Sequence, residues 1–244
     1  MSATTSSQTA QVDETKKRLI DGLRVLDGEG MFEKAFGHIS ARVPASELIV
    51  MMGHVHEHVR TLAQTRAEDL IVIDADGTLL DGPYEPPGEF HIHTEVLRAR
   101  GDVGAVVHCH PRSPVALSIT RSEVLPVTWR AGIFHPRVPL LEDPRQIDTA
   151  ERGRAVARTL ADGRAVTLMG HGVVCVGADV GQAAVVTIDL SDAARFQLEA
   201  MAAGGAHALP DELIAHRRDT PPEAEGFTSA WNYYRAKWCR GDQR

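Results

Sequence analysis

A short apolar run near the middle of the chain constrains the fold most, because it ends in two histidines and a proline. Residues 103–110 are rich in valine and predict a buried β-strand. Side chains alternate on a strand, so His108 and His110 share one face and Cys109 takes the other. Two imidazoles about 7 Å apart on a strand can bind one metal ion, although the same pair also suits an exposed polar face. Pro111 then turns the chain away from the sheet.

The flanking segments alternate between helical and strand patterns, which predicts an α/β fold. Tight turns such as Asp74-Ala75-Asp76-Gly77 join several strands, so we expect a mixed or antiparallel sheet with helices on its faces. Residues 1–12 lack the apolar core of a signal peptide and predict a disordered N-terminal tail, followed by a single domain over residues 13–244. The expected helices are 13–28, 89–100, 144–160, 179–203 and an amphipathic stretch over 227–238, and the other expected strands are 39–43, 48–52, 70–73, 78–80, 165–169 and 173–176.

Charge and composition argue against several classes of protein. Lys+Arg 26 against Asp+Glu 33 gives a net charge of −7, which does not suit a nucleic-acid partner. The sequence has no run of 18 apolar residues, so neither a transmembrane helix nor a membrane partner is expected. Three cysteines in 244 residues are too few for a disulfide framework and indicate a reducing compartment, hence a cytoplasmic protein.

Histidine is abundant in this chain and lysine is scarce. There are twelve histidines and only four lysines. A Schiff-base aldolase needs a buried lysine with a lowered pKa. The lysines here fall in the first and last predicted helices and in the loop after the first, away from the central strands. Metal activation is therefore the only route to a carbanion that the sequence supports. The four lysines are Lys16, Lys17, Lys34 and Lys237.

Two further residues are candidate ligands, each with an ordinary alternative. Glu89 opens a predicted helix directly after Pro86-Pro87-Gly88, where a carboxylate also suits the helix dipole. His171 lies between two glycines at a predicted turn between strands, and a turn histidine alone needs no functional role. His91 and His93 follow Glu89 on the same helix, and we interpret both as structural.

Taken together, Glu89, His108, His110 and His171 resemble, in order and spacing, the zinc or manganese site of the class II aldolase/adducin family. Pro87-Gly88-Glu89 stands where the sugar-phosphate enzymes of the family have Ser-Ser-Glu. The other blocks that carry the resemblance are Gly37-His38-Ile39-Ser40-Ala41-Arg42, similar to the family's G-N-x-S-x-R loop; the Asp69–Asp74 strand; Gly104–Pro111, close to A-V-V-H-x-H-P; and Gly170-His171-Gly172-Val173, similar to its H-G-hydrophobic turn.

The resemblance implies a three-layer α/β sandwich with a central, largely antiparallel sheet flanked by helices. It also implies a homotetramer with active sites at the subunit interfaces, in which the tail over about 205–244 packs on a neighbouring subunit. By the same resemblance, His108, His110 and His171 bind one divalent metal ion per subunit, Zn²⁺ or Mn²⁺ with Fe²⁺ as an alternative. Glu89 is then a fourth ligand that becomes the catalytic acid or base when substrate displaces it.

Departures from the family motifs point away from a sugar phosphate as substrate. Pro87 and Gly88 replace the two serines and His38 replaces the asparagine, which removes donors that would bind a phosphate dianion. Ser40 and the backbone of Gly37 remain as candidate substrate contacts. A phosphate is therefore less expected than another anion.

Basic side chains suggest a carboxylate as that anion. His38, Arg60 and Arg66 are the candidate carboxylate binders, because a planar guanidinium matches a carboxylate through two hydrogen bonds. The loop that holds Arg60 also carries three alternating histidines. They allow a second metal site, but a polar loop is the favoured interpretation because no buried strand is predicted there. These histidines are His54, His56 and His58.

The family resemblance extends to a branch that acts on non-phosphorylated acids, including decarboxylases of hydroxylated aromatic dicarboxylates. We therefore predict a divalent-metal-dependent carbon–carbon lyase, in the first place a decarboxylase of a hydroxylated aromatic or oxo carboxylic acid. Glu89 is the first candidate for the acid that returns a proton to carbon. Tyr233 or Tyr234 from the tail of a neighbouring subunit is the second candidate, against ordinary packing of a C-terminal helix.

Three alternatives use the same fold differently. A class II (retro-)aldolase would cleave a hydroxy-oxo compound at the same site. Three histidines with open coordination positions also suit a non-heme iron oxygenase. An adducin-like, non-catalytic scaffold would need no ligands, so the intact set of three histidines and Glu89 argues against it.

Overall fold

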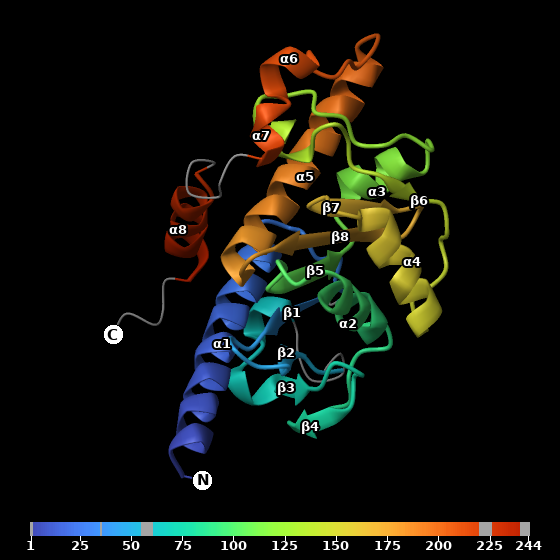
Figure 1. Cartoon of the computed structure of the whole chain (residues 1–244). Helices are drawn as coiled ribbons and strands as arrows, with labels where there is room; N and C mark the ends of the chain where they lie inside the picture. The colour runs from blue at the N-terminus through green and yellow to red at the C-terminus, as the bar shows by residue number, and fades with distance from the viewer. Residues whose placement is uncertain (1, 35, 55–60, 220–225, 240–244) are drawn as a thin grey trace.

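A computed structural model of the chain places helices on both faces of one central sheet (Figure 1). The structure describes residues 2–34, 36–54, 61–219 and 226–239. Its strands are β1 His38–Arg42, β2 Ile49–Met52, β3 Leu70–Ile73, β4 Leu79–Asp81, β5 Ala105–Cys109, β6 Leu140–Leu141, β7 Ala165–Leu168 and β8 Gly172–Gly177. Its α-helices are α1 Ser2–Gly28, α2 Phe90–Ala99, α3 Arg112–Ser118, α4 Ala150–Leu160, α5 Val180–Ala202, α6 Asp211–Ile214, α7 His216–Asp219 and α8 Phe227–Trp238.

The described strands form one eight-stranded sheet in the order β4-β3-β2-β1-β5-β8-β7-β6. Every strand pair is antiparallel except β6 with β7, which confirms the predicted largely antiparallel sheet. The two central strands β1 and β5 pair so that His38 lies opposite His108. On its other side β5 pairs with β8, which follows directly on the turn that holds His171. The sheet order thus brings three separate histidine motifs to one place.

Two hydrophobic cores, one on each face of the sheet, complete the three layers. Helices α1 and α5 cover one face, and α2 and α4 cover the other (Figure 1). Side chains of β5 alternate between the cores: Val107 and Cys109 pack in the α1–α5 core, and Val106 packs in the α2–α4 core. His108 therefore shares the face of Val106, as the strand pattern predicts.

Helix α1 differs most from the expectation. It begins at Ser2, whereas the sequence predicts a disordered tail over residues 1–12 and a helix start at Asp13. That prediction is wrong for residues 2–12, because residues 2–21 contain no glycine or proline that would stop the helix. Val12 already packs against the core, so the helical register is set before Asp13.

Other boundaries shift for local reasons. Helix α4 begins at Ala150 instead of residue 144, because the Thr149 side chain accepts a hydrogen bond from the backbone N–H of Arg152 and caps the helix there. Helix α3, directly after Pro111, was not expected at all. Pro111 stands at the N-cap of this helix, where the missing backbone N–H removes no helical hydrogen bond.

The C-terminal helix α8 packs on its own chain, against α1 and α5 (Figure 1). Trp231 lies over Gly181, where a β-carbon would come within 2.9 Å of the indole ring. The guanidinium of Arg235 also donates a hydrogen bond to the Asp21 carboxylate at 2.8 Å. The buried side of α8 therefore packs within its own subunit and not, as the family resemblance implies for this tail, on a neighbouring one. Its outward side is available to a neighbour.

Two expectations from composition can be compared with the described residues. None of the described helices is long and apolar enough to cross a membrane. Cys109 and Cys175 are buried, Cys239 is partly buried, and all three are free thiols.

Candidate metal centre

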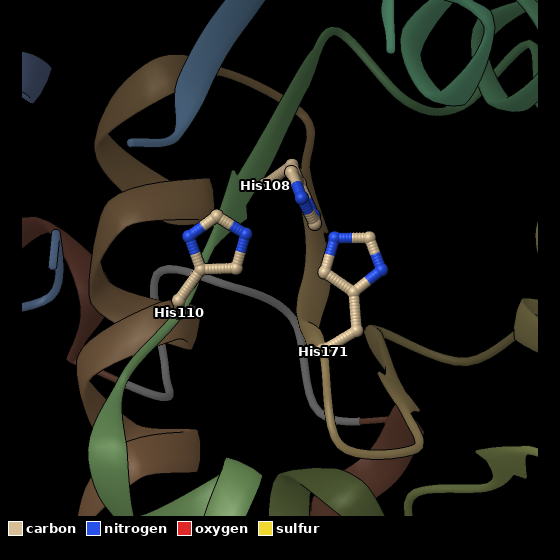
Figure 2. A group of neighbouring side chains, drawn as sticks. All are labelled: His108, His110 and His171. Atoms are coloured by element: carbon tan, nitrogen blue, oxygen red, sulfur yellow. The ribbon is translucent and has the colours of Figure 1, made fainter. Parts of the chain in front are cut away.

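Three imidazoles converge where β5 ends and β8 begins (Figure 2). His108 is on β5, His110 follows its last residue, and His171 lies in the turn before β8. The ring centroids are 4.8 Å apart for His108 and His110, 5.1 Å for His108 and His171, and 5.4 Å for His110 and His171. One ring nitrogen of each lies within 4.8 Å of the others. The spacing matches a set of ligands around one metal ion.

Backbone carbonyls orient two of these rings. Nδ1 of His108 lies 3.0 Å from the Val173 carbonyl oxygen and donates a hydrogen bond to it. His110 makes a hydrogen bond with the Phe36 backbone. A histidine that donates one ring N–H to a carbonyl turns the lone pair of its other nitrogen to a metal. Consistent with this, Nε2 of His108 is buried and has no hydrogen-bond partner among the described residues.

Glu89 adds a carboxylate to the imidazoles. It stands at the N-cap of α2 and is 8% exposed. Its Oε1 accepts a hydrogen bond from the Ile147 backbone N–H at 2.8 Å. Its two oxygens each lie 3.5 Å from an Nε2 atom, Oε2 from that of His108 and Oε1 from that of His171. The carboxylate is thus held beside His108 and His171 by a contact from a distant loop.

The charges of the cluster suit a cation. Burial raises the pKa of Glu89, but the adjacent imidazoles of His108 and His171, each 3.5 Å from a carboxylate oxygen, outweigh it and hold the pKa well below its usual value. Burial and the two neighbouring imidazoles lower the pKa of His110 to about 3. The imidazole ring is therefore neutral at pH 7 and offers a lone pair, while Glu89 supplies a negative charge. Three imidazole nitrogens and one carboxylate are a donor set that fits Zn²⁺, Mn²⁺ or Fe²⁺.

A second layer of polar groups lies behind this cluster. His38 has a ring nitrogen within 4.8 Å of the ligand atoms of Glu89 and His108. Its Nδ1 lies 2.6 Å from Nε2 of His93, and Nδ1 of His93 lies 2.7 Å from Ser40 Oγ. Ser40 and His93 are fully buried, so Ser40 lies behind His38 instead of at the substrate side where it was predicted.

The remaining predicted contacts are not all brought to the cluster. Gly37 has a φ of +124°, and a β-carbon there would lie 2.9 Å from the His108 carbonyl oxygen, so it is needed for the close approach of the chain to β5. Arg66 is exposed and pairs with Glu68 at 3.5 Å. Arg60 lies outside the described residues, as do His56 and His58, and the backbone N–H of His54 donates to the Glu85 carbonyl.

The two tail tyrosines lie on α8, which packs against α1 and α5. Tyr233 is 62% exposed, whereas Tyr234 packs against the core. Burial, followed by the charge of Asp189, raises the pKa of Tyr234 to about 12. Tyr233 is therefore the one that an adjacent subunit could meet directly.

Sequence reasoning missed the central position of His93. It was interpreted as structural because a helical histidine next to a catalytic carboxylate has no distinctive signal. The available signal was its spacing: His93 lies one turn after Glu89, so both residues lie on the same side of α2. The contact of Glu89 with the Ile147 backbone had no signal in the sequence.

Comparison with known proteins identifies the family of the chain. A model of the class II aldolase and adducin N-terminal domain matches residues 17–198. The chain belongs to the class II aldolase and adducin family. The prediction made from its motifs is therefore confirmed.

Individual relatives are decarboxylases, aldolases and an oxygenase. The chain is 33% identical to a 3,4-dihydroxyphthalate decarboxylase from Terrabacter sp. (strain DBF63), over 89% of this chain and 94% of that protein. It is 34% identical to a 4-hydroxy-3-prenylphenylpyruvate oxygenase/4-hydroxy-3-prenylbenzoate synthase from Streptomyces roseochromogenus subsp. oscitans, over 68% of this chain and 60% of that protein. An L-fuculose 1-phosphate aldolase from Glaciozyma antarctica PI12 has the same fold, with a TM-score of 0.82 and 22% identity over 97% and 94% of the two chains. The predicted fold is confirmed, and the predicted lyase class agrees with these relatives.

The packing around Gly172 predicts how the ligands respond to a small change. A β-carbon at Gly172 would lie 2.5 Å from the Cys109 carbonyl oxygen and 2.7 Å from Cδ2 of His110. We expect Gly172→Ala to displace the His110 ring and to weaken Zn²⁺ binding by about 10–100-fold. Competition with a chromophoric chelator measures that affinity.

Gly101→Ala is the matched control, because no atom lies within 4 Å of its added β-carbon. Melting curves of both variants without metal separate a loss of folding from a loss of ligand geometry. Unchanged Zn²⁺ affinity in a folded Gly172→Ala protein would contradict the assignment of His110.

Proposed function

We propose that the chain binds one divalent metal ion per subunit through His108, His110 and His171, with Glu89 as the fourth ligand of the resting site. The converging rings, the Nε2 of His108 that has no hydrogen-bond partner among the described residues, and the carboxylate beside it support this assignment. The donor set suits Zn²⁺, Mn²⁺ and Fe²⁺ alike, so these three ions are the candidates. The family to which the chain belongs makes a divalent ion the expected cofactor.

The reaction that we propose is decarboxylation of a hydroxylated aromatic carboxylic acid, with a dihydroxyphthalate as the first candidate. The similarity to a 3,4-dihydroxyphthalate decarboxylase over 89% of the chain is the observation that carries this proposal. Pro87 and Gly88, which replace the hydroxyl side chains of the sugar-phosphate enzymes, support a substrate without phosphate.

Glu89 would move the proton in this reaction. A bound cation supplies a Lewis acid that draws electron density from the hydroxyl oxygen next to the departing carboxylate. Glu89 takes the proton of that hydroxyl and gives it to the ring carbon that carries the carboxylate, which makes this carbon tetrahedral. The bond from this carbon to the carboxylate then breaks, CO₂ leaves, and the electron pair of the bond restores the aromatic ring and returns the negative charge to the hydroxyl oxygen. The hydrogen bond from the Ile147 backbone keeps the carboxylate in place for both transfers.

Two other activities remain as second candidates on specific grounds. The fold shared with an L-fuculose 1-phosphate aldolase favours retro-aldol cleavage of a hydroxy-oxo compound. The similarity to an oxygenase favours dioxygen chemistry with Fe²⁺ at the same ligands. An adducin-like scaffold is the least supported, because it would not need the buried donor set.

Substrate contacts and assembly complete the proposal. His38 lies next to Glu89 and His108 and would contact the substrate carboxylate together with Arg60. Ser40 would contribute by holding His93 behind His38, and Gly37 by allowing the loop before β1 to approach β5. The protein would be a cytoplasmic homotetramer with active sites at the subunit interfaces. The exposed Tyr233 would reach the adjacent site, with Tyr234 as its packed neighbour at a ring distance of 5.3 Å.

Removal of two ligands tests the metal assignment. We expect the wild-type chain to hold one divalent ion per subunit by elemental analysis and to release CO₂ from 3,4-dihydroxyphthalate. The variant His108→Ala/His110→Ala should lose both, because only two of the four proposed ligands remain. His91→Ala is the control, since His91 lies on α2 outside the cluster and should leave both unchanged.

Other products would indicate one of the alternative activities. Aldehyde released from a hydroxy-oxo acid without CO₂ would overturn decarboxylation in favour of the aldolase. Oxygen consumption would favour the iron enzyme. A wild-type chain without stoichiometric metal would contradict all three.

Glu89→Gln tests the proton transfers. Glutamine keeps the size of the side chain and an acceptor for the Ile147 N–H but cannot carry the proton. We expect kcat to fall by about 10²–10⁴-fold, with binding of the dihydroxybenzoate product retained in a titration. A Glu89→Gln enzyme with kcat near that of wild type would assign the proton transfer to another group.

Mixed tetramers test the tail tyrosine. Tyr233→Phe and Glu89→Gln should each be inactive alone. Co-expressed, they should regain about a quarter of wild-type activity, because about one interface in four then joins an intact Glu89 to an intact tyrosine. A wild-type monomer, an active Tyr233→Phe tetramer, or mixed tetramers without recovery would each contradict a shared site.

A further inference from the structure

Three buried polar side chains form a hydrogen-bonded chain that begins at the candidate metal centre and leads into the protein. Nδ1 of His38 lies 2.6 Å from Nε2 of His93, and Nδ1 of His93 lies 2.7 Å from Ser40 Oγ. His38 is 5% exposed, and the other two are fully buried. Because Nδ1 of His38 forms a hydrogen bond with His93, Nε2 is the nitrogen of His38 that can interact with a group in the candidate metal centre.

The backbone makes this chain rigid. His38 and Ser40 are two residues apart on β1, so both side chains point to the face that α2 covers. His93 comes from the middle of α2, one turn after the Glu89 N-cap. The rings of His38 and His93 are 4.8 Å apart and inclined by 59°, which lets the nitrogen of one point at the nitrogen of the other.

The number of protons decides which group donates. Both rings are buried away from water, which disfavours the charged form of an imidazole, so each ring is neutral and carries a single N–H. Ser40 has one hydroxyl proton, and the hydrogen bond that its Oγ makes among the described residues is with His93. If His93 donated to Ser40, the buried hydroxyl proton would have no acceptor, which is unfavourable. Ser40 therefore donates to Nδ1 of His93.

The rest of the chain follows from that first bond. Because Nδ1 of His93 accepts, its proton is on Nε2, and this N–H donates to Nδ1 of His38. The proton of His38 is then on Nε2. The nearby Glu89 carboxylate, within 4.8 Å of a His38 ring nitrogen, favours the same arrangement, because it attracts an N–H and repels a lone pair.

We propose that Ser40 and His93 are positioning residues that hold His38 in the tautomer with its proton on Nε2, so that His38 offers the site a fixed hydrogen-bond donor for a substrate carboxylate. The nature of the substrate rests on the proposed function, whereas the tautomer does not. A fixed donor discriminates in favour of an anionic oxygen, and it cannot serve as a further ligand because its lone pair is on the other side of the ring.

Nuclear magnetic resonance of the full chain labelled with ¹⁵N-histidine reads the tautomer directly. Spectra are recorded as purified and with Zn²⁺, and the His38 signals are assigned by their loss in His38→Gln. We expect Nε2 of His38 to show a directly bonded proton and Nδ1 to show a lone pair, with the same pattern for His93. A proton on Nδ1 of His38 would overturn the proposal.

A matched pair of variants at Ser40 tests the effect on binding. Ser40→Ala removes the hydroxyl that orders the chain, and Ser40→Thr keeps it. We expect Ser40→Ala to populate both tautomers of His38 and to raise KM for 3,4-dihydroxyphthalate about tenfold, with Zn²⁺ content unchanged and with little change in kcat. Ser40→Thr should restore the single tautomer and the wild-type KM.

The outcomes separate this proposal from the one on which it rests. If 3,4-dihydroxyphthalate is not a substrate, the tautomer spectra of the wild-type chain still decide the order of donors. A Ser40→Ala protein with the wild-type tautomer and the wild-type KM contradicts the positioning role. If the variant does not fold, the spectrum of the wild-type chain alone decides.

Discussion

The antiparallel pairing of β5 with β1 on one side and β8 on the other is the constraint on which the rest of the site depends. It sets His38 opposite His108 and brings the His171 turn beside the end of β5. Gly172 makes the close approach achievable, since a side chain there would enter the space of the His110 ring. A slip of one residue in either pairing would turn His108 into the opposite core. The apolar cores, which fix that register, therefore determine the ligand geometry as well.

Charge within the cluster is balanced by the same architecture. Several imidazoles buried together disfavour one another's protonation, so burial and their mutual repulsion lower the pKa of His93 and of His110 to about 3. Glu89 is the buried carboxylate among them, and its backbone contact with Ile147 ties the loop before α4 to the N-terminus of α2. The site is thus rich in neutral donors with one negative charge, an arrangement that suits the divalent cation proposed for it.

Local patterns in the sequence could predict only part of this site. Strand alternation was enough to put His108 and His110 on one face with Cys109 opposite, because that property is local. Glu89 and His171 became candidates only through the family resemblance, since each has an ordinary local explanation. His93 and Ser40 could not be paired in advance, because their contact depends on where α2 docks on β1. The start of α1 at Ser2 was missed because its first turns have little apolar pattern to read.

The position of His38 connects the site to the question of substrate. In the sugar-phosphate enzymes that the motifs resemble, an amide side chain stands at this position, and an amide has both a donor and an acceptor that it can exchange by rotation. A histidine held by a buried partner has no such freedom: its ring presents one nitrogen in one protonation state. If the fold and the proposed ligand set are retained while an adaptable amide is replaced by a fixed donor, the substrate that the site accepts would change and the proposed cofactor would not. A common metal cluster with a variable group beside it would thus account for a family that includes both an L-fuculose 1-phosphate aldolase and a 3,4-dihydroxyphthalate decarboxylase.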